Sequence, residues 1–253
     1  MNMYREWAEF YDALYEGQGQ SRDIPFLVNL VKKYGGPVLE CACGTGRVMI
    51  PIAKAGFEIH GIDTSDDMLR VLEKKLSMLP EKVRRKITYE KKDMRNFDIR
   101  KKFKTCIIAF SSLYHLKSDN EIRQFLHCVR RNLEGNGTLI IDVFDFNPRL
   151  EQGKFILQVR TKDQKGRTIS KYAKTVFGRN QVNDCWFRIA VEEKGKRKLI
   201  HRKFKLHYLL YDQMWKLLES EKFRVLKVYG NYNSEPYSTR KQNEKMIFVA
   251  KKI

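Results

Sequence analysis

The sequence predicts an α/β protein built on a mostly parallel sheet, with an antiparallel β block inserted toward the C-terminal end. Short apolar runs alternate with amphipathic stretches over the first 145 residues, as in strand–helix–strand units. After Pro148 the pattern changes to strands joined by short turns, and a helix with two strands then closes the chain. The antiparallel block therefore interrupts one domain and does not start another.

The strands and helices of the first part can be placed from their apolar patterns. Strands are expected at residues 37–41, 57–63, 87–91, 105–110 and 138–144. Helices are expected from near Ser21 and over residues 46–54, 65–78 and 119–133. Ser65 is a good helix start, because its hydroxyl can accept from free backbone amides. Gly135 and Gly137 are expected to end the fourth of these helices.

The inserted block reads as four strands with glycine or asparagine turns. They are expected at residues 154–160, 168–177, 185–192 and 199–209, followed by a helix at 212–220 and strands at 224–229 and 245–250. We therefore divide the chain into a core of residues 1–148 and 210–253, with an N-terminal lid over about 1–20, and an inserted subdomain of residues 149–209.

The composition is that of a folded globular protein, with 42% hydrophobic and 32% charged residues in 253. No apolar run approaches the roughly 20 residues that cross a membrane, and the N-terminus has no apolar signal core, so we expect a cytoplasmic protein that contacts no membrane. Five cysteines form no CxxC pair, which favours reduced, buried thiols. No cluster of His, Asp or Glu has metal-ligand spacing.

The formal net charge of +20 draws the protein toward polyanions at low salt. Eleven Lys or Arg lie in residues 82–104 against three acids, and seven lie in residues 194–205 with none. Solvated surface explains both clusters better than a nucleic-acid site does. Nucleic-acid binding is therefore possible but not favoured.

An apolar strand runs into a turn with Gly44 and Gly46 and then into a helix, which predicts a site for a nucleotide-like ligand. The dinucleotide fingerprint GxGxxG would need glycine where the chain has Ala42 and Arg47, so NAD is disfavoured. Glu40 ends the strand, and its carboxylate would repel a pyrophosphate but attract an amino group or a sulfonium.

Two more acids follow the next strands. Asp63 lies where a carboxylate can hold a ribose diol. Asp93 can accept from an adenine amino group, and the Met94 thioether can cover the ring. Each has a plainer interpretation, because Asp63 could lead the helix start, Asp93 could cap a turn toward Asn96, and Met94 could be core. Together they fit adenosine with a positive tail and no phosphate.

At these residues the chain resembles the class I S-adenosylmethionine-dependent methyltransferases, from about Tyr11 to Phe144. The resemblance implies a Rossmann-like, seven-stranded, mostly parallel sheet with a reversed last strand. It implies S-adenosylmethionine as cofactor and S-adenosylhomocysteine as product. Glu40 and Ala42 depart from the commonest residues of the first motif. The expected cofactor contacts are Tyr11, Tyr15, Arg22, Glu40, Ala42, Gly44, Gly46, Asp63, Met68, Asp93, Met94 and Phe110.

Two further segments are similar to small-molecule members of that class, including those that N-methylate amino sugars. Residues 8–15 with 17–20 resemble their N-terminal lid, and residues 110–116 resemble their active-site segment. By this resemblance Tyr11 closes over the cofactor near the reactive methyl, and His115 faces the substrate and can accept a proton near neutral pH. Both could instead be packing residues. Arg22 or Arg240 could bind a substrate phosphate or the cofactor carboxylate, or be surface cations.

Methyl transfer from a sulfonium is a direct displacement, so the protein mainly aligns the reacting atoms. No Asn-Pro-Pro-Tyr or Asp-Pro-Pro-Tyr segment and no Pro-Cys nucleophile follows the fourth strand. Methylation of a planar amino group, or of a base through a covalent cysteine, is therefore disfavoured. The resemblance to small-molecule members implies transfer to nitrogen or oxygen of a small metabolite, with nitrogen favoured. The alternatives are an RNA or ribosome-linked methyltransferase and a non-catalytic cofactor-binding partner protein. In relatives the antiparallel block builds a substrate wall or a subunit contact, so a homodimer through it is possible.

Overall fold

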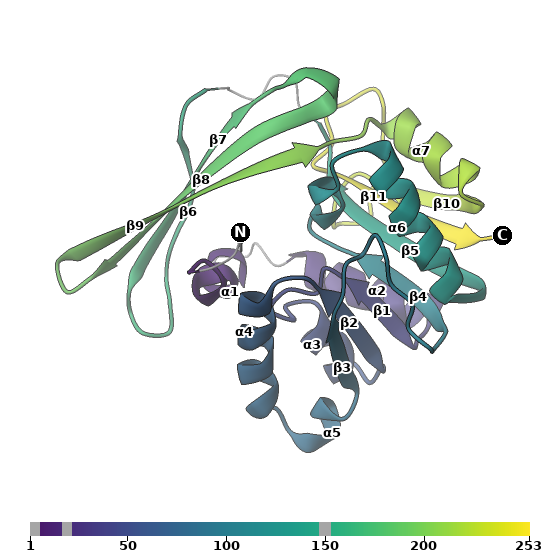
Figure 1. Cartoon of the computed structure of the whole chain (residues 1–253), viewed down its shortest axis with the longest axis horizontal. Coiled ribbons are helices and arrows are strands. Elements are labelled where there is room, and N and C mark those ends of the chain that lie inside the picture. Colours follow the sequence, from purple (N-terminus) through teal and green to yellow (C-terminus); the bar gives the residue numbers. More distant parts are fainter. Residues whose placement is uncertain (1–5, 17–21, 147–152) are drawn as a thin grey trace.

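The chain folds into a seven-stranded sheet and a separate four-stranded sheet (Figure 1). The computed structural model describes residues 6–16, 22–146 and 153–253. The larger sheet has the spatial order β10 (Phe223–Tyr229), β11 (Lys245–Lys252), β5 (Leu133–Phe144), β4 (Phe103–Ile108), β1 (Val38–Cys41), β2 (Ile59–Asp63) and β3 (Ile87–Lys91). β1 to β5 pair in parallel, and β11 runs antiparallel to both of its neighbours. The predicted mostly parallel sheet with a reversed last strand is confirmed.

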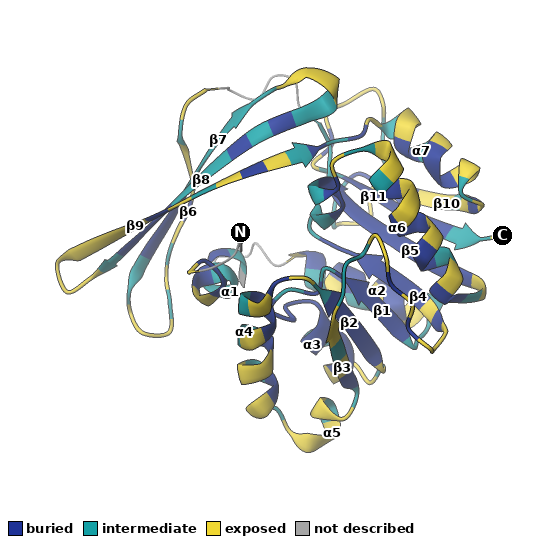
Figure 2. Cartoon of the chain, in the orientation of Figure 1, coloured by how far each residue is buried: buried dark blue, intermediate teal, exposed yellow. Residues whose placement is uncertain are grey.

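Helices cover both faces of this sheet because its central strands are buried and apolar on both sides. In β1, Leu39 and Cys41 pack in one core cluster with α6 (Asp119–Asn132) and α7 (Tyr211–Ser220). Val38 packs in the other cluster, to which α2 (Asp23–Tyr34), α3 (Met49–Lys54) and α4 (Asp66–Ser77) contribute their apolar side chains. Figure 2 shows the buried strands between helices whose outer faces are exposed. A short helix, α5 (Glu81–Arg84), precedes β3.

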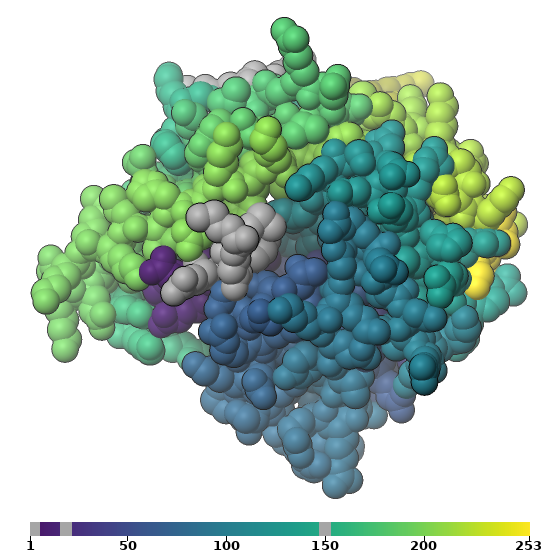
Figure 3. All heavy atoms as spheres, in the orientation of Figure 1, coloured from purple at the N-terminus to yellow at the C-terminus, as the bar shows by residue number. Residues whose placement is uncertain are grey.

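The four-stranded antiparallel sheet follows the order β6 (Ile156–Lys162), β7 (Thr168–Val176), β8 (Val182–Glu193) and β9 (Lys196–His207). Helix α1 (Ala8–Glu16) lies between this sheet and α4 (Figure 1). A third core cluster joins α1 to the sheet through Phe10, Leu14, Ile169 and Ile189 among others. In the space-filling view the antiparallel sheet forms the upper left of the molecule (Figure 3). The predicted domain division remains a proposal, and its boundary near residue 148 lies outside the described residues.

The predicted helix start at Ser65 is confirmed, because its Oγ accepts from the backbone amide of Met68 at 3.3 Å. The predicted end of the α6 helix at Gly135 and Gly137 is wrong. The helix ends at Asn132, whose buried side chain donates to the Cys128 carbonyl and accepts from the Ile99 amide, each at 2.8 Å. β5 begins at the next residue, so both glycines lie within a strand.

All five cysteines are buried and free, as expected, with Cys41 and Cys106 Sγ atoms 3.9 Å apart. Among the described residues, no helix has the length and apolar character needed to span a lipid bilayer.

Candidate active site

Three residues of the loop after β1 lie in the left-handed backbone region. Ala42, Gly44 and Gly46 have φ of 59°, 54° and 74°, and α3 therefore begins at Met49 and not at Gly46 as predicted. A Cβ on Gly46 would collide with the Leu72 side chain, so this position needs glycine for space as well as conformation. A Cβ on Gly44 would meet nothing within 4 Å, so the loop borders open space there.

Two of the predicted acids flank this loop. Asp63 accepts from the backbone amides of Gly44 at 2.9 Å and Ser65 at 2.8 Å, so it fixes the loop and leads the helix start. Burial raises the pKa of Asp63 above its usual value. Glu40 is buried, its Oε2 has no hydrogen-bond partner, and burial raises its pKa to about 8. A buried acceptor without a partner is expected to be satisfied by a ligand, and a cationic one would suit this carboxylate.

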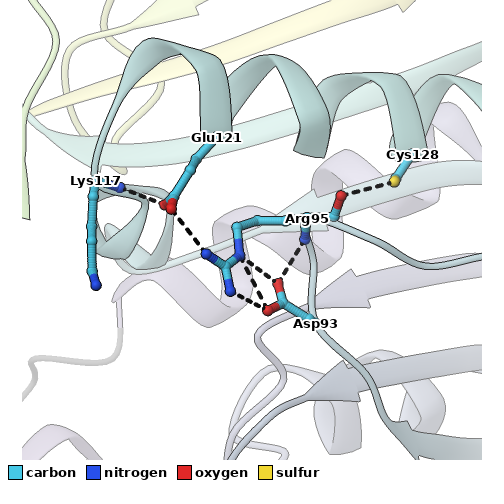
Figure 4. Close-up of polar contacts among 5 residues, drawn as sticks. All are labelled: Asp93, Arg95, Lys117, Glu121 and Cys128. Carbon is cyan, nitrogen blue, oxygen red and sulfur yellow. Dashed lines mark hydrogen bonds and ion pairs between the residues drawn. The ribbon is translucent and has the colours of Figure 1, made fainter.

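Asp93 is engaged within the protein (Figure 4). Its carboxylate accepts from the Arg95 amide at 2.8 Å and from the Arg95 guanidinium, with Nη2 at 2.6 Å, which lowers the pKa of Asp93. Arg95 also reaches Glu121 of α6 at 2.9 Å. Asp93 forms a β-bridge with Asn96, at the turn that was the plainer interpretation of this residue. Met94 packs against the core. Met68 is buried in the first turn of α4. The adenine contacts stay a prediction.

The α1 helix is fastened over the glycine loop by Asp12. This carboxylate accepts from Thr45 Oγ1 in the loop at 2.5 Å and from Lys75 Nζ in α4 at 2.6 Å. The Tyr11 and Tyr15 rings lie 4.6 Å apart between centroids, and Tyr15 is 4.8 Å from the Phe110 ring. Burial raises the pKa of both tyrosines, which keeps their hydroxyls protonated. The part of the predicted lid at residues 17–20 lies outside the described residues.

Arg47, the residue that argued against an NAD site, forms a buried ion pair that the sequence did not reveal. Its guanidinium donates to both oxygens of Asp23, with Nη1 at 3.0 Å and Nη2 at 2.5 Å, and it lies over the Phe110 ring at 4.8 Å. Both charged side chains are at most 5% exposed. The available signal was a single cation directly before the apolar run of α3.

The strand before the active-site segment ends two residues earlier than predicted. Phe110 and Ser111 take left-handed φ of 55° and 60°, so β4 ends at Ile108. The buried Asp142 of β5 holds this turn, because its carboxylate accepts from the Phe110 amide at 3.0 Å and from the Tyr232 hydroxyl at 2.9 Å. The local signal for this contact is Asp142 itself, an acid inside the apolar run of β5.

A cavity of about 240 Å³ opens between the two sheets beside this turn. Of the predicted residues it brings together Tyr11, Tyr15, Phe110 and His115. Its remaining lining residues are Trp7, Ser111, Ser112, Phe144, Lys171, Phe187, Phe204, Leu206 and Lys245. The His115 ring lies 5.4 Å from the Phe204 ring, and burial lowers the pKa of His115 to about 4. Histidine is therefore neutral here over the physiological range.

Two predicted cations lie elsewhere. Arg22 is exposed at the start of α2 in a surface hollow with Phe26 and Tyr232, and Arg240 is exposed in another hollow with Tyr211. Neither lines the cavity between the sheets.

Comparisons with known proteins agree with this arrangement. Residues 38–137 match the family described as a methyltransferase domain. The chain is 28% identical over 196 residues, 75% of this chain and 78% of the relative, to a dTDP-3-amino-3,4,6-trideoxy-α-D-glucopyranose N,N-dimethyltransferase of Streptomyces venezuelae. Residues 38–137 therefore form a methyltransferase domain. S-adenosylmethionine stays the cofactor that the sequence resemblance implies.

Solved structures share the fold of this methyltransferase over its whole length. An S-adenosylmethionine-dependent methyltransferase from Clostridium acetobutylicum has a TM-score of 0.80 at 16% identity, with 99% of each chain covered. DesVI of Streptomyces venezuelae has a TM-score of 0.80 at 21% identity, with 98% of each chain covered. The class I methyltransferase fold is therefore established for this chain.

Proposed function

We propose that this methyltransferase transfers the methyl group to a nitrogen atom of a small metabolite bound in the cavity between the two sheets. The observation that carries the proposal is the cavity itself, whose volume of about 240 Å³ and aromatic walls suit a small molecule. The sugar N,N-dimethyltransferase activity named for the Streptomyces venezuelae relative supports nitrogen over oxygen.

The cofactor supplies an activated methyl group on a sulfonium. We propose that Asp63 holds its ribose and that Glu40 faces its positively charged tail, because Glu40 Oε2 lacks a partner and Gly44 borders open space. Tyr11 and Phe110 line the cavity, and we propose that the cofactor reaches the cavity beside them. These residues align the reacting atoms, and alignment alone contributes on the order of 7–11 kcal/mol in model reactions.

Cofactor binding is expected to release a proton from Glu40. Because its pKa is raised to about 8, the carboxyl is protonated at pH 7 before the cofactor binds. A cation beside it favours the ionised form, so S-adenosylmethionine affinity should rise with pH up to about pH 8. Calorimetry at pH 7 in two buffers of different ionisation enthalpy measures the released proton. Glu40→Gln should lose this proton release, and equal release by both proteins would contradict the assignment.

His115 is expected to orient the acceptor and not to titrate during turnover near neutral pH. We propose this role in place of proton acceptance at pH 7, because burial lowers the pKa of His115 to about 4. A neutral imidazole can accept a hydrogen bond from an amine. The kcat profile should show no break between pH 6 and 7. His115→Ala should lower kcat by up to about tenfold, because one neutral hydrogen bond contributes about 0.5–1.5 kcal/mol and about 1.4 kcal/mol is a tenfold change in rate. A break in that range that disappears in His115→Ala would restore the original role.

The proposal is tested by offering the protein methyl-labelled S-adenosylmethionine with fractionated cell extract. We expect label on nitrogen of a compound of low molecular weight. Label on RNA, with retention that falls steeply with salt, would favour the RNA methyltransferase instead. The basic residues of the two sequence clusters argue against that outcome, because several pair with acids, including Arg84 with Glu81 and Lys203 with Asp184. No transfer to any fraction would leave the cofactor-binding partner protein. A homodimer through the antiparallel sheet remains a further prediction.

A further inference from the structure

The cavity between the two sheets has a one-sided charge. The ionisable side chains that line it are two lysines, a histidine and two tyrosines, namely Lys171, Lys245, His115, Tyr11 and Tyr15. No carboxylate is among its described lining residues. An ammonium group on a substrate would therefore meet cations and aromatic rings there, whereas an anionic group would meet opposite charge.

Lys171 is the cation without a counter-charge. It lies in β7 on the same face as Ile169, which packs toward α1, and its side chain is buried. Its Nζ donates to Tyr15 Oη at 2.7 Å and lies 4.4 Å from the centre of the Tyr15 ring. No ion pair joins it to any carboxylate of the described chain. One hydrogen bond leaves donors of the ammonium unused, and burial lowers the pKa of Lys171 to about 8.

Lys245 differs because it has an acid nearby. Its Nζ lies 3.4 Å from Asp142 Oδ1, on the side of the cavity formed by the seven-stranded sheet. The Asp142 carboxylate also accepts from the Phe110 amide and the Tyr232 hydroxyl. The uncompensated positive charge of the cavity therefore lies at Lys171, on the antiparallel sheet.

We propose that Lys171 binds an anionic group, a carboxylate or a phosphate, carried by the methyl acceptor. This deepens the proposed function, because it assigns the acceptor to molecules that bear a nitrogen and a negative charge within the same small cavity. A buried ammonium loses its hydration, and an anion placed beside it restores the lost stabilisation. The anion would enter from the cavity, since Tyr15 covers Lys171 from the α1 side.

Binding without turnover tests this proposal. The protein saturated with S-adenosylhomocysteine is titrated with benzoate, with its neutral counterpart benzamide, and with inorganic phosphate. We expect at least one anion to bind, benzamide to bind at least tenfold more weakly than benzoate if benzoate is that anion, and Lys171→Met to weaken the anion at least tenfold. The preferred anion identifies the group as carboxylate or phosphate. Failure of both anions to bind, or equal affinity in wild type and Lys171→Met, would overturn the proposal.

Two controls test whether the charge of Lys171 binds the anion and whether that anion belongs to the acceptor or to the cofactor. Lys171→Arg keeps the charge and should keep anion binding, while Lys174→Met removes a nearby β7 lysine that contacts Trp186 and does not line the cavity, so it should change nothing. S-adenosylhomocysteine is compared with 5′-methylthioadenosine, which lacks the carboxylate. If Lys171→Met weakens only the former and leaves anion binding unchanged, the anion belongs to the cofactor and the acceptor assignment is wrong. Because nothing turns over, these results stand apart from the test of methyl transfer to nitrogen.

Discussion

Asp63→Ala is expected to lower the affinity for S-adenosylhomocysteine by roughly 100-fold or more. The carboxylate is proposed to hold the ribose, and it also binds the Gly44 and Ser65 amides that shape the glycine loop. A hydrogen bond to a charged group contributes about 1.5–3 kcal/mol, and about 1.4 kcal/mol is a tenfold change in Kd. Isothermal calorimetry measures the loss directly.

Asp66→Ala is the matched control for this experiment. Asp66 lies three residues away at the start of α4, where it is exposed and pairs with Lys91 on the surface. The affinity of Asp66→Ala for S-adenosylhomocysteine should stay within about twofold of wild type, because the Asp66–Lys91 pair lies outside the proposed cofactor contacts. Exposed ion pairs contribute at most about 1 kcal/mol. An unchanged affinity in Asp63→Ala would remove the ribose assignment and, with it, the proposed orientation of the cofactor.

Arg47→Met is expected to cause the largest loss of stability. It leaves the Asp23 carboxylate buried without its cation, and breaking a buried ion pair in this way costs about 3–5 kcal/mol. For a domain of this size each kcal/mol lowers Tm by about 2–4 °C, so a decrease of roughly 10 °C is expected. Thermal and urea denaturation followed by circular dichroism measure it.

The double variant Asp23→Asn with Arg47→Met should recover part of that loss, because it removes the unpaired charge as well. The surface control is Arg84→Met, whose pair with Glu81 is about half-exposed and should contribute at most about 1 kcal/mol. If Arg47→Met were no more destabilising than Arg84→Met, the ion pair with Asp23 would not stabilise the glycine loop that carries Arg47.

Most of the fold could be predicted because local patterns decide it. Strands such as β1 and β4 are apolar on both faces, which identifies a parallel sheet covered on both sides. The predicted ends of β4 and α6 were wrong, because at each of them a contact between residues distant in sequence overrides the local pattern. β4 ends early because Asp142, thirty-two residues away, holds the Phe110 amide. The α6 helix ends at Asn132, whose side-chain oxygen accepts a hydrogen bond from the Ile99 amide. This contact is made only in the folded chain.

The residue pattern alone predicts the candidate site where its residues lie at strand ends of the sheet, whereas Tyr11, Tyr15 and His115 were predicted from the resemblance to known methyltransferases. Glu40 and Asp63 stand out because they follow apolar strands next to the glycine turn. Lys171 could not be found in this way, because its importance comes from α1 packing against β7, which brings Tyr15 onto it across 156 residues of sequence. A lysine at an inward-facing position of an antiparallel strand was the single local signal.

A crystal structure of the protein with S-adenosylhomocysteine tests the central claim most directly. The account predicts the ribose on Asp63, the amino-acid tail beside Glu40, and the sulfur directed past Tyr11 and Phe110 into the cavity with His115. A nucleoside bound elsewhere, or a sulfur directed away from that cavity, would contradict it.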